Sequence, residues 1–250
     1  MCEYNPYSLK GKTILITGAS SGIGRATAIE CSKMGAQVII TGRNKERLNE
    51  TFKALKNDGH LQVIAELSDE NDLLNLVNSI PEIDGLVNNA GLTKLLMTSF
   101  INKKDLSEIL SVNTIAPILL TQKLLKNKKI KKKASVVFVS SIAGNNRASL
   151  GNGMYATSKA AINAFMKNAA LELAPKRIRC NSVAPGMVLT NIMGLDLAID
   201  EQSKKDMQTY PLKRYGTPEE IAYAIVYLLS DATAWVTGIS LVVDGGKTLQ

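Results

Sequence analysis

The chain has 250 residues, of which 45% are hydrophobic, 21% are charged and 5% are aromatic. No apolar stretch approaches the roughly 18 residues of a membrane-spanning helix, and the hydrophobic fraction is too high for a disordered chain. The net charge of +8 suggests nucleic-acid binding. However, the excess is concentrated in a lysine cluster over residues 123–133, which has no aromatic side chain for base stacking. We therefore expect neither a nucleic-acid partner nor a membrane contact.

Histidine and cysteine usage narrows the chemistry further. His60, the only histidine, stands beside Gly59 in a polar stretch and is interpreted as a loop residue. The chain thus lacks the histidines of Ser-His-Asp hydrolases and zinc sites, and no metal is expected. Cys2, Cys31 and Cys180 are far apart, which is typical of reduced thiols. Because the first residues also lack a signal-peptide pattern, we expect a cytoplasmic protein.

Short apolar runs alternate with helical patterns along the whole chain. Strands are predicted at residues 12–17, 37–41, 61–65, 85–88, 135–140, 178–183 and 240–243. Helices are predicted at residues 23–34, 45–57, 69–79, 103–126, 154–173 and 218–230. Nearly continuous apolar strands are typical of parallel strands that helices cover on both faces. The pattern predicts a single α/β domain over residues 1–250, with a doubly wound Rossmann fold and a mostly parallel seven-stranded sheet.

A glycine-rich loop, TGASSGIG over residues 17–24, lies between the first predicted strand and the first predicted helix. Gly18 permits a tight turn, Gly22 lets the backbone approach a pyrophosphate, and Gly24 allows helix and strand to pack closely. The phosphates would meet the free N–H groups at the positive end of the helix. The loop predicts dinucleotide binding by Gly18, Ser20, Ser21, Gly22, Ile23 and Gly24.

Tyr155 and Lys159 lie one turn apart on one face of the predicted helix over residues 154–173. A tyrosine with a pKa near 10 is a poor acid–base group at neutral pH. A nearby ammonium group stabilises the phenolate and would lower this pKa by roughly one to three pH units. The pair can then exchange a proton with a substrate oxygen. Ser140 and Ser141 end the fifth predicted strand, at the carboxyl edge where such sheets bind ligands.

Eight short motifs follow one another along the chain. They are TGASSGIG (17–24), NNAG (88–91), SVNTIAP (111–117), SSIAG (140–144), YATSK (155–159), NSVAPG (181–186), RYGTPEEIA (214–222) and TGISLVVDGG (237–246). In this order they resemble the short-chain dehydrogenase/reductase family over essentially the whole chain. The resemblance implies an oxidoreductase that transfers a hydride between NAD(P)(H) and a carbonyl or secondary alcohol. It also implies a homo-oligomer, usually a dimer or a tetramer, and we expect the tetramer.

The family's catalytic tetrad falls on Asn113, Ser141, Tyr155 and Lys159. The resemblance implies that Tyr155 donates the proton in reduction and that Lys159 lowers its pKa and binds the nicotinamide ribose. Ser141 would hydrogen-bond the carbonyl oxygen, and Asn113 would hold a water of a proton relay. Ser141 precedes Tyr155 by 14 residues, one more than is usual in the family, which implies a one-residue insertion. Ser140 is the lesser candidate.

The same resemblance implies further cofactor contacts. Asn89, Ala90 and Gly91 would stabilise the sheet beside the cofactor, and Glu66 and Leu67 would lie near the adenine. Glu66 replaces the family's usual aspartate and is one methylene longer. The nicotinamide would be held by Pro185, Gly186, Val188 and Thr190. Some of the glycines and prolines could instead serve only the backbone shape.

The end of the second predicted strand favours NADP(H) over NAD(H). An NAD enzyme generally has an acidic residue there that accepts the ribose hydroxyls, whereas this segment has no carboxylate before Glu46. Arg43 would contact the 2′-phosphate, unless it is only a solvated loop residue. Arg25 lies too far around its helix to help. No basic residue stands inside the glycine loop, where Ser21 precedes Gly22.

The substrate is less defined than the cofactor. Chain length and the PLKRYGTPEEIA stretch resemble the 3-oxoacyl-(acyl-carrier-protein) reductases of the family, which implies an acyl thioester substrate and an acyl carrier protein partner. Sugar, polyol and steroid dehydrogenases remain alternatives, as does a non-catalytic dinucleotide-binding protein. The segment of about residues 191–210 is predicted to be an apolar substrate lid. The lysine cluster either attracts an acidic carrier protein or only solubilises a helix end.

Overall fold

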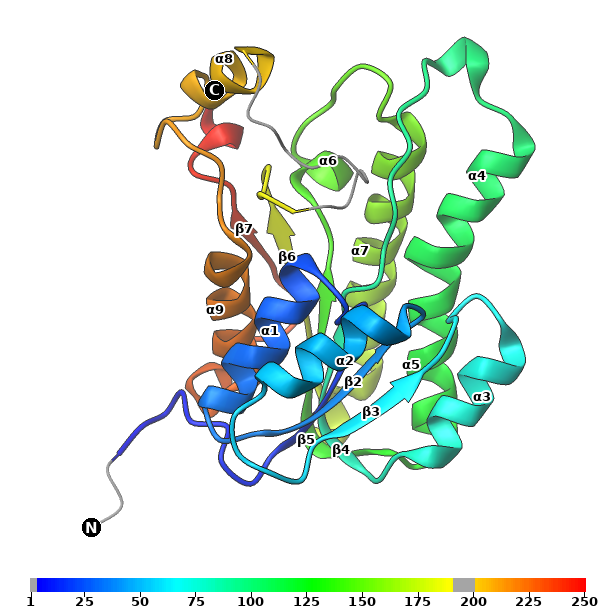
Figure 1. The fold of residues 1–250 in the computed structure, drawn as a ribbon, viewed down its shortest axis with the longest axis vertical. Helices are drawn as coiled ribbons and strands as arrows, with labels where there is room; N and C mark the ends of the chain where they lie inside the picture. Colours follow the sequence, from blue (N-terminus) through cyan, green and yellow to red (C-terminus); the bar gives the residue numbers. More distant parts are fainter. Residues whose placement is uncertain (1–3, 191–200) are drawn as a thin grey trace.

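The computed structural model describes residues 4–190 and 201–250 (Figure 1). Within these residues one seven-stranded sheet has the order β3-β2-β1-β4-β5-β6-β7, and every neighbouring pair is parallel. The strands are β1 (Thr13–Thr17), β2 (Gln37–Gly42), β3 (Leu61–Ile64), β4 (Ile83–Asn88), β5 (Ile130–Val139), β6 (Arg179–Pro185) and β7 (Ser240–Val243). This topology confirms the predicted doubly wound Rossmann fold.

Helices cover both faces of the sheet (Figure 1). One layer consists of α1 (Gly22–Lys33), α2 (Lys45–Ala54) and α9 (Pro218–Leu229). The other layer consists of α3 (Glu70–Ser79), α4 (Lys103–Leu110), α5 (Ala116–Lys126) and α7 (Gly153–Leu173). Two short helices, α6 (Ile142–Asn145) and α8 (Glu201–Gln208), lie above the carboxyl edge of the sheet. None of the described helices is long and apolar enough to cross a membrane.

Alternate side chains of the central strands enter two separate cores, because successive residues of a strand point to opposite faces. In β1, Leu15 packs toward α3, α5 and α7, whereas Ile14 and Ile16 pack toward α1, α2 and α9. In β5, Phe138 meets Phe165 of α7 edge to face, with ring centroids 5.9 Å apart. Burial on both faces explains why the strands appear as nearly continuous apolar runs.

The helix predicted over residues 103–126 is interrupted. Between α4 and α5, residues Ser111–Ile115 form a π-helical turn that contains the buried Asn113. In a regular α-helix the carbonyl of Asn113 would accept from the N–H of residue 117, but that residue is Pro117 and has no N–H. Such turns often occur at functional sites.

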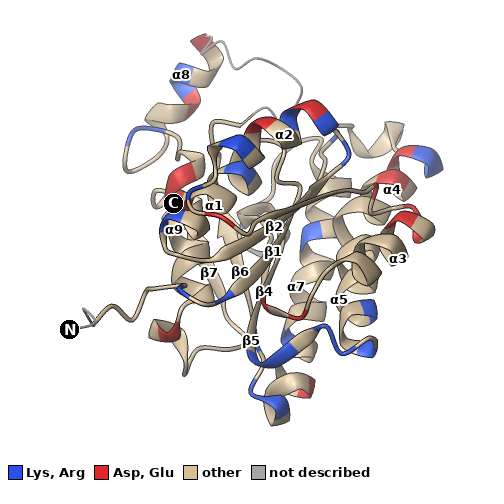
Figure 2. Cartoon of the chain, turned by 60° about the horizontal axis from the view of Figure 1, so that its bottom comes forward, with Lys and Arg blue, Asp and Glu red and all other residues tan. Residues whose placement is uncertain are grey.

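The lysine cluster begins in the last turn of α5 and continues into the start of β5, at the amino edge of the sheet. Strand β5 begins at Ile130, earlier than predicted, so that it includes Lys131, Lys132 and Lys133. Figure 2 shows these basic residues beside the start of β5. The partner strand β4 runs from Ile83, opposite Ile130, to Asn88, opposite Phe138, which is about 17 Å, so the cluster lies well away from the carboxyl edge.

Several charges of this cluster already have partners. Lys131 pairs with Asp84 at 2.9 Å, and Lys123 pairs with Glu70 at 3.0 Å. The Nζ of Lys129 donates to the carbonyl of Ile80. The position and the pairing support the interpretation as a solvated face and do not support guidance of a partner to the catalytic edge.

His60 and the described cysteines support the fold and lie outside the predicted site. His60 lies in the loop before β3, where its Nδ1 accepts a hydrogen bond from the backbone N–H of Val38 at 3.0 Å. Cys31 and Cys180 are buried free thiols, and burial raises the pKa of both. Thiols of this kind are unreactive.

Candidate active site

Two adjoining cavities of about 410 Å³ each lie over the carboxyl edge of the sheet. The catalytic cavity is lined by Tyr155 and its neighbours, and the dinucleotide cavity is lined by the glycine loop. The two cavities share Ile23, Asn89, Gly91 and Thr190, so they form one cleft. The cleft crosses the point where the strand order reverses between β1 and β4, which is where doubly wound sheets bind ligands.

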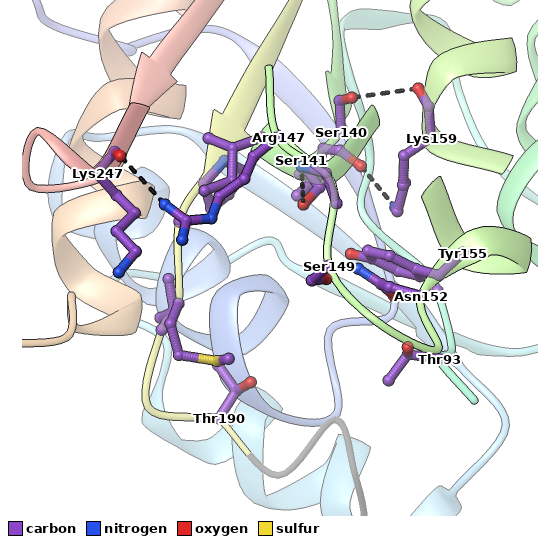
Figure 3. A pocket seen from close by; sticks show the side chains of 18 of the residues that line it. Thr93, Ser140, Ser141, Arg147, Ser149, Asn152, Tyr155, Lys159, Thr190 and Lys247 are labelled. Atoms are coloured by element: carbon purple, nitrogen blue, oxygen red, sulfur yellow. Dashed lines mark hydrogen bonds between the residues drawn. The ribbon is translucent and has the colours of Figure 1, made fainter. Parts of the chain in front are cut away.

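Tyr155 and Lys159 enter the catalytic cavity from the first two turns of α7 (Figure 3). The Nζ of Lys159 donates a buried hydrogen bond of 2.7 Å to the carbonyl of Val139 at the end of β5. It lies 5.7 Å from the centre of the Tyr155 ring. The four-residue spacing thus brings both groups to one cavity, as the sequence predicts.

Burial dominates the ionisation of both groups. It raises the pKa of Tyr155 to about 12, although hydrogen bonding with the Ser141 side chain lowers this pKa in part. It lowers the pKa of Lys159 to about 8. The expected lowering of the Tyr155 pKa by Lys159 is not found, because desolvation of the phenolate outweighs it and the ammonium is directed to the Val139 carbonyl.

The two consecutive serines after β5 differ in their partners. Ser141 caps the short helix α6, where its Oγ accepts from the N–H of Ala143 at 3.2 Å, and it borders the cavity beside Tyr155. Ser140 is buried, and its Oγ donates to the carbonyl of Lys159 at 3.3 Å. Ser140 therefore fixes α7 against β5, whereas Ser141 is the hydroxyl next to the tyrosine.

Asn113 lies behind the cavity wall and lines neither cavity. Its Oδ1 accepts from the N–H of Leu92 at 2.9 Å, and its Nδ2 donates to the Leu92 carbonyl at 2.9 Å and to Ser158 Oγ at 3.0 Å. Between Asn113 and Lys159 lies Gly91, where a Cβ would be 3.3 Å from the amide oxygen and 3.4 Å from the ammonium. Asn113 thus positions the segment that borders Lys159.

The glycine loop has the backbone that its sequence requires. Gly18 and Gly22 have φ angles of +63° and +52°, in the left-handed region that favours glycine. A Cβ at Gly18 would lie 2.8 Å from the Cα of Ala90. A Cβ at Gly24 would clash with the carbonyl oxygen of Gly18, so Gly24 serves the packing of α1 and does not line the cavity.

The start of α1 suits a phosphate group. Ser21 is the N-cap residue, and its side chain makes no capping hydrogen bond. The first N–H groups of α1 therefore lack a side-chain acceptor, and they lie beside a cavity that Ser20, Ser21, Gly22 and Ile23 line. An anion at this position would satisfy these N–H groups, so the residues present fit a dinucleotide pyrophosphate.

Asn89 connects the ends of two central strands below the cleft. Its Nδ2 donates to the carbonyls of Thr17 and Gly18, at 3.0 and 3.2 Å. The Thr17 hydroxyl accepts from the N–H groups of Asn89 and Ala90, at 2.9 and 3.0 Å. These contacts hold the ends of β1 and β4 together. They match the supporting role that the sequence predicts for this segment.

The far end of the dinucleotide cavity is lined by Arg43, Arg47, Glu66 and Leu67. Arg43 and Glu66 form an ion pair at 3.3 Å, and the Arg43 side chain is 71% exposed. Sequence reasoning missed Arg47, which lies in the first turn of α2, where its N–H donates to the N-cap Asn44 at 2.8 Å. Its spacing of four residues from Arg43 was the available signal. Arg25, which pairs with Glu50 at 3.4 Å, does not line the cavity.

The segment after β6 forms another wall of the catalytic cavity. The N–H of Gly186 donates to the carbonyl of Val243 at 3.0 Å, and Val188 forms a bridge with Gly216. The predicted residues in this wall are Pro185, Gly186, Val188 and Thr190. Residues 191–200 of the predicted lid lie outside the described residues.

Sequence reasoning missed much of the cavity lining because these residues lie in four separate segments. The apolar members include Leu95, Leu150 and Met187, and the polar members include Arg147, Ser149 and Lys247. The described part of the predicted lid contributes Asp206 and Tyr210. No local pattern links these positions.

The comparison with known proteins identifies the family. A family model described as enoyl-(acyl carrier protein) reductase matches residues 18–248. The chain belongs to the short-chain dehydrogenase/reductase family. It is 35% identical over 241 residues to 3-oxoacyl-(acyl-carrier-protein) reductase FabG of Rickettsia prowazekii, covering 96% of this chain and 98% of the relative. It is 34% identical over 245 residues to the FabG reductase of Aquifex aeolicus, covering 95% and 98%.

Solved structures agree with this assignment. A candidate NAD(P)-dependent gluconate 5-dehydrogenase from Beutenbergia cavernae, with NADP bound at low occupancy, superposes with a TM-score of 0.88. It is 30% identical and covers 98% of this chain and 100% of its own. A mutant short-chain dehydrogenase/reductase from Serratia marcescens has a TM-score of 0.89 at 29% identity, covering 98% and 100%. The protein is therefore an oxidoreductase that acts on a carbonyl or alcohol group with a nicotinamide dinucleotide.

Proposed function

We propose that this short-chain dehydrogenase/reductase is an NADP(H)-dependent reductase of 3-oxoacyl thioesters carried by an acyl carrier protein. The observation that carries the proposal is the continuous cleft, which joins a phosphate-binding helix start to a cavity containing Ser141, Tyr155 and Lys159. The FabG relatives support the substrate class, since their names specify 3-oxoacyl groups on the carrier protein.

In this proposal Tyr155 donates the proton and Ser141 orients the carbonyl oxygen. A phenol with a pKa of about 12 is fully protonated at neutral pH, which suits a donor in the reduction direction. The adjacent Ser141 hydroxyl donates to the oxygen as negative charge develops there. The bound dinucleotide supplies the hydride. The ammonium of Lys159 holds the nicotinamide ribose hydroxyls and stabilises the phenolate that proton transfer leaves on Tyr155.

The preference for NADP(H) rests on the charges at the far end of the dinucleotide cavity. Arg43 and Arg47 both line it, and the carboxylate of Glu66 is paired with Arg43. A 2′-phosphate that binds Arg43 and Arg47 forms charge-assisted hydrogen bonds and meets a carboxylate that is already compensated.

Turnover assays with a substrate panel test the proposed function. NADPH oxidation should be fast with acetoacetyl thioesters of pantetheine and of acyl carrier protein. It should be much slower with 5-oxogluconate, sugars and simple secondary ketones. Faster turnover of a sugar acid than of the acetoacetyl thioesters would favour the alternative of a sugar dehydrogenase. Tight NADPH binding without turnover of any member would favour the non-catalytic alternative.

We also propose that the enzyme is a homotetramer. Two helices that cover the sheet carry exposed apolar side chains, namely Leu119 on α5 and Leu171 on α7, and Ile115 is exposed at the end of the π-helical turn just before α5. A second exposed group, Tyr223 and Trp235, lies on and after α9. Two separate apolar surfaces support two kinds of subunit contact, which a tetramer with twofold symmetry needs.

A further inference from the structure

One cation in the catalytic cavity has no acidic partner among the described residues. Arg147, in the loop between α6 and α7, lines the same cavity as Ser141 and Tyr155 (Figure 3). Its Nη1 donates to the backbone carbonyl of Lys247 at 3.3 Å. Among the described residues it forms no ion pair with a carboxylate. Because a guanidinium has five N–H donors, this contact leaves most of them for a ligand.

The neighbouring cation, Lys247, is already compensated. It is only 4% exposed, and its Nζ donates to Thr209 Oγ1. The ammonium lies 3.8 Å from the carboxylate of Asp206 and 4.5 Å from the centre of the Tyr210 ring. These contacts satisfy Lys247 within the protein, so it shapes the wall of the cavity. Apart from Lys159, Arg147 is then the described lining cation that can bind a ligand.

The only carboxylate among the described lining residues does not neutralise Arg147. Asp206 accepts a hydrogen bond from the Tyr215 hydroxyl at 2.8 Å and lies beside Lys247. The described charged residues of the lining are thus three cations, Arg147, Lys159 and Lys247, and one carboxylate. A partly enclosed cavity with this imbalance has a positive potential, which favours an anionic ligand.

The groups that would reduce the substrate and the cation that would bind an anion lie on different sides of the cavity. In Figure 3 Arg147 reaches toward Lys247 on one side, and Tyr155 and Lys159 lie on the other. A substrate carbonyl at Tyr155 and Ser141 therefore leaves another part of the same molecule near Arg147. Carboxylate and phosphate groups match a guanidinium best, since both accept two parallel hydrogen bonds from it.

We propose that Arg147 determines specificity by binding an oxyanion of the carbonyl substrate, either a carboxylate of the substrate itself or the phosphate of its thioester arm. The inference rests on the proposed function only in that Tyr155 reduces a carbonyl in this cavity. It adds a charge requirement that neither the family motifs nor the tetrad contains.

Two matched pairs of substrates distinguish the sources of the oxyanion. The carboxylate pair is 3-oxobutanoate and its methyl ester, and the phosphate pair is acetoacetyl-4′-phosphopantetheine and acetoacetyl-pantetheine. The measurement is kcat/KM with NADPH for the wild type, Arg147→Gln and Arg147→Lys. Lys205→Gln, which removes an exposed charge on α8 that does not line the cavity, is the matched control.

We expect the wild type to prefer the anionic member of one pair by about tenfold or more. Arg147→Gln should abolish this preference and change kcat/KM for the neutral member by less than about twofold. Arg147→Lys should retain part of the preference, and Lys205→Gln should retain all of it. The inference is wrong if the wild type shows no preference in either pair, or if Arg147→Gln slows both members equally.

A binding measurement separates this inference from the proposed function. Calorimetric titration of the NADP⁺-loaded enzyme with 3-oxobutanoate and with 4′-phosphopantetheine requires no turnover, because the oxidised cofactor has no hydride to transfer to the keto acid. We expect at least one anion to bind about tenfold more weakly to Arg147→Gln than to the wild type. If no substrate is reduced but this difference is found, the proposed function fails and the anion site remains. Equal affinity of both proteins for both anions would overturn the anion site alone.

Discussion

The ammonium of Lys159 lies 5.7 Å from the centre of the Tyr155 ring, and a hydrogen bond of 2.7 Å directs it to the Val139 carbonyl. Burial disfavours the charged form of each group. It therefore raises the pKa of the tyrosine to about 12 and lowers that of the lysine to about 8. At neutral pH the cavity therefore holds a neutral phenol beside an ammonium close to its titration range. This arrangement favours proton donation to a substrate over proton abstraction from it.

Replacement of Tyr155 by Phe removes the hydroxyl and keeps the ring. We expect kcat to fall by about 10²–10⁴-fold, because the substrate oxygen loses its proton donor. The affinity for NADPH, measured by fluorescence titration, should change by less than about twofold, since the phenol contributes little to cofactor binding. A variant that keeps more than about a tenth of the wild-type rate would show that another group transfers the proton.

Replacement of Lys159 by Met should stabilise the protein while it abolishes activity. Burial lowers the pKa of the Lys159 ammonium from 10.5 to about 8. This lowering costs about 3 kcal/mol of folding stability at a pH where the lysine is protonated in both the folded and the unfolded state. Below pH 8 the whole cost is present, and it is relieved as the pH rises from 8 to 10.5. The lost hydrogen bond to Val139 offsets about 1 kcal/mol.

We therefore expect Lys159→Met to raise the free energy of unfolding by about 2 kcal/mol at pH 7, with a smaller gain at pH 10. Urea denaturation at both pH values measures it. Lys167→Met on the exposed face of the same helix is the control and should show no such pH dependence. Equal or lower stability of Lys159→Met at pH 7 would contradict the assigned cost of burial.

Arg43 should determine the choice of cofactor. We expect the kcat/KM of the wild type to be higher with NADPH than with NADH. Arg43→Gln should lower the value for NADPH by about tenfold and leave that for NADH nearly unchanged, because only NADPH carries the 2′-phosphate. Arg25→Gln, which removes an arginine outside the cavity, is the control. A wild-type preference for NADH would refute the NADP(H) assignment.

Glu220 should stabilise the start of α9 in a pH-dependent manner. Its carboxylate accepts from Arg214 at 2.7 and 2.6 Å and from the N–H of Thr217 at 2.9 Å, and these contacts lower its pKa to about 2. A folded-state pKa below the ordinary 4.5 gives stability that is complete above pH 4.5 and is lost as the pH falls toward 2. Because the side chain is 37% exposed, solvent screening reduces the effect.

We expect Glu220→Gln to cost about 1 kcal/mol at pH 7 and less at pH 3, by chemical denaturation. Thr217 and Glu220 form a capping box at the start of α9, in which each side chain accepts from the backbone N–H of the other residue. Glu219→Gln changes an exposed carboxylate of the same turn that is not part of this box, so it should cost less at both pH values. A cost for Glu220→Gln that does not depend on pH would show that packing, not charge, is responsible.

Leu171 should belong to a subunit interface. Its side chain is 77% exposed on α7, and a lysine at this position would place an unpaired charge in an apolar contact. Light scattering at micromolar concentration should give a tetramer for the wild type and smaller species for Leu171→Lys. Leu212→Lys, at an exposed position away from α5 and α7, is the control. A monomeric wild type of 27.0 kDa would contradict the proposal.

Features that depend on neighbouring residues were predictable from the sequence. The apolar runs predicted the buried strands because helices cover both faces of the sheet. The glycine loop predicted the backbone at Gly18 and Gly22, since only glycine adopts that conformation without strain. The four-residue spacing of Tyr155 and Lys159 predicted a shared face, because a helix turn brings such residues together.

Features that depend on distant segments were decided by the tertiary structure. The pKa of Tyr155 follows from burial under loops that no local pattern specifies, so the sign of its shift was not predictable. The lysine cluster lies at the amino edge of the sheet because β5 starts at Ile130. Arg147 and Lys247 are 100 residues apart and meet only because the loop after β5 and the C-terminal segment pack against the same cavity. The sequence determined the elements and their motifs, whereas packing alone decided which charges face a ligand.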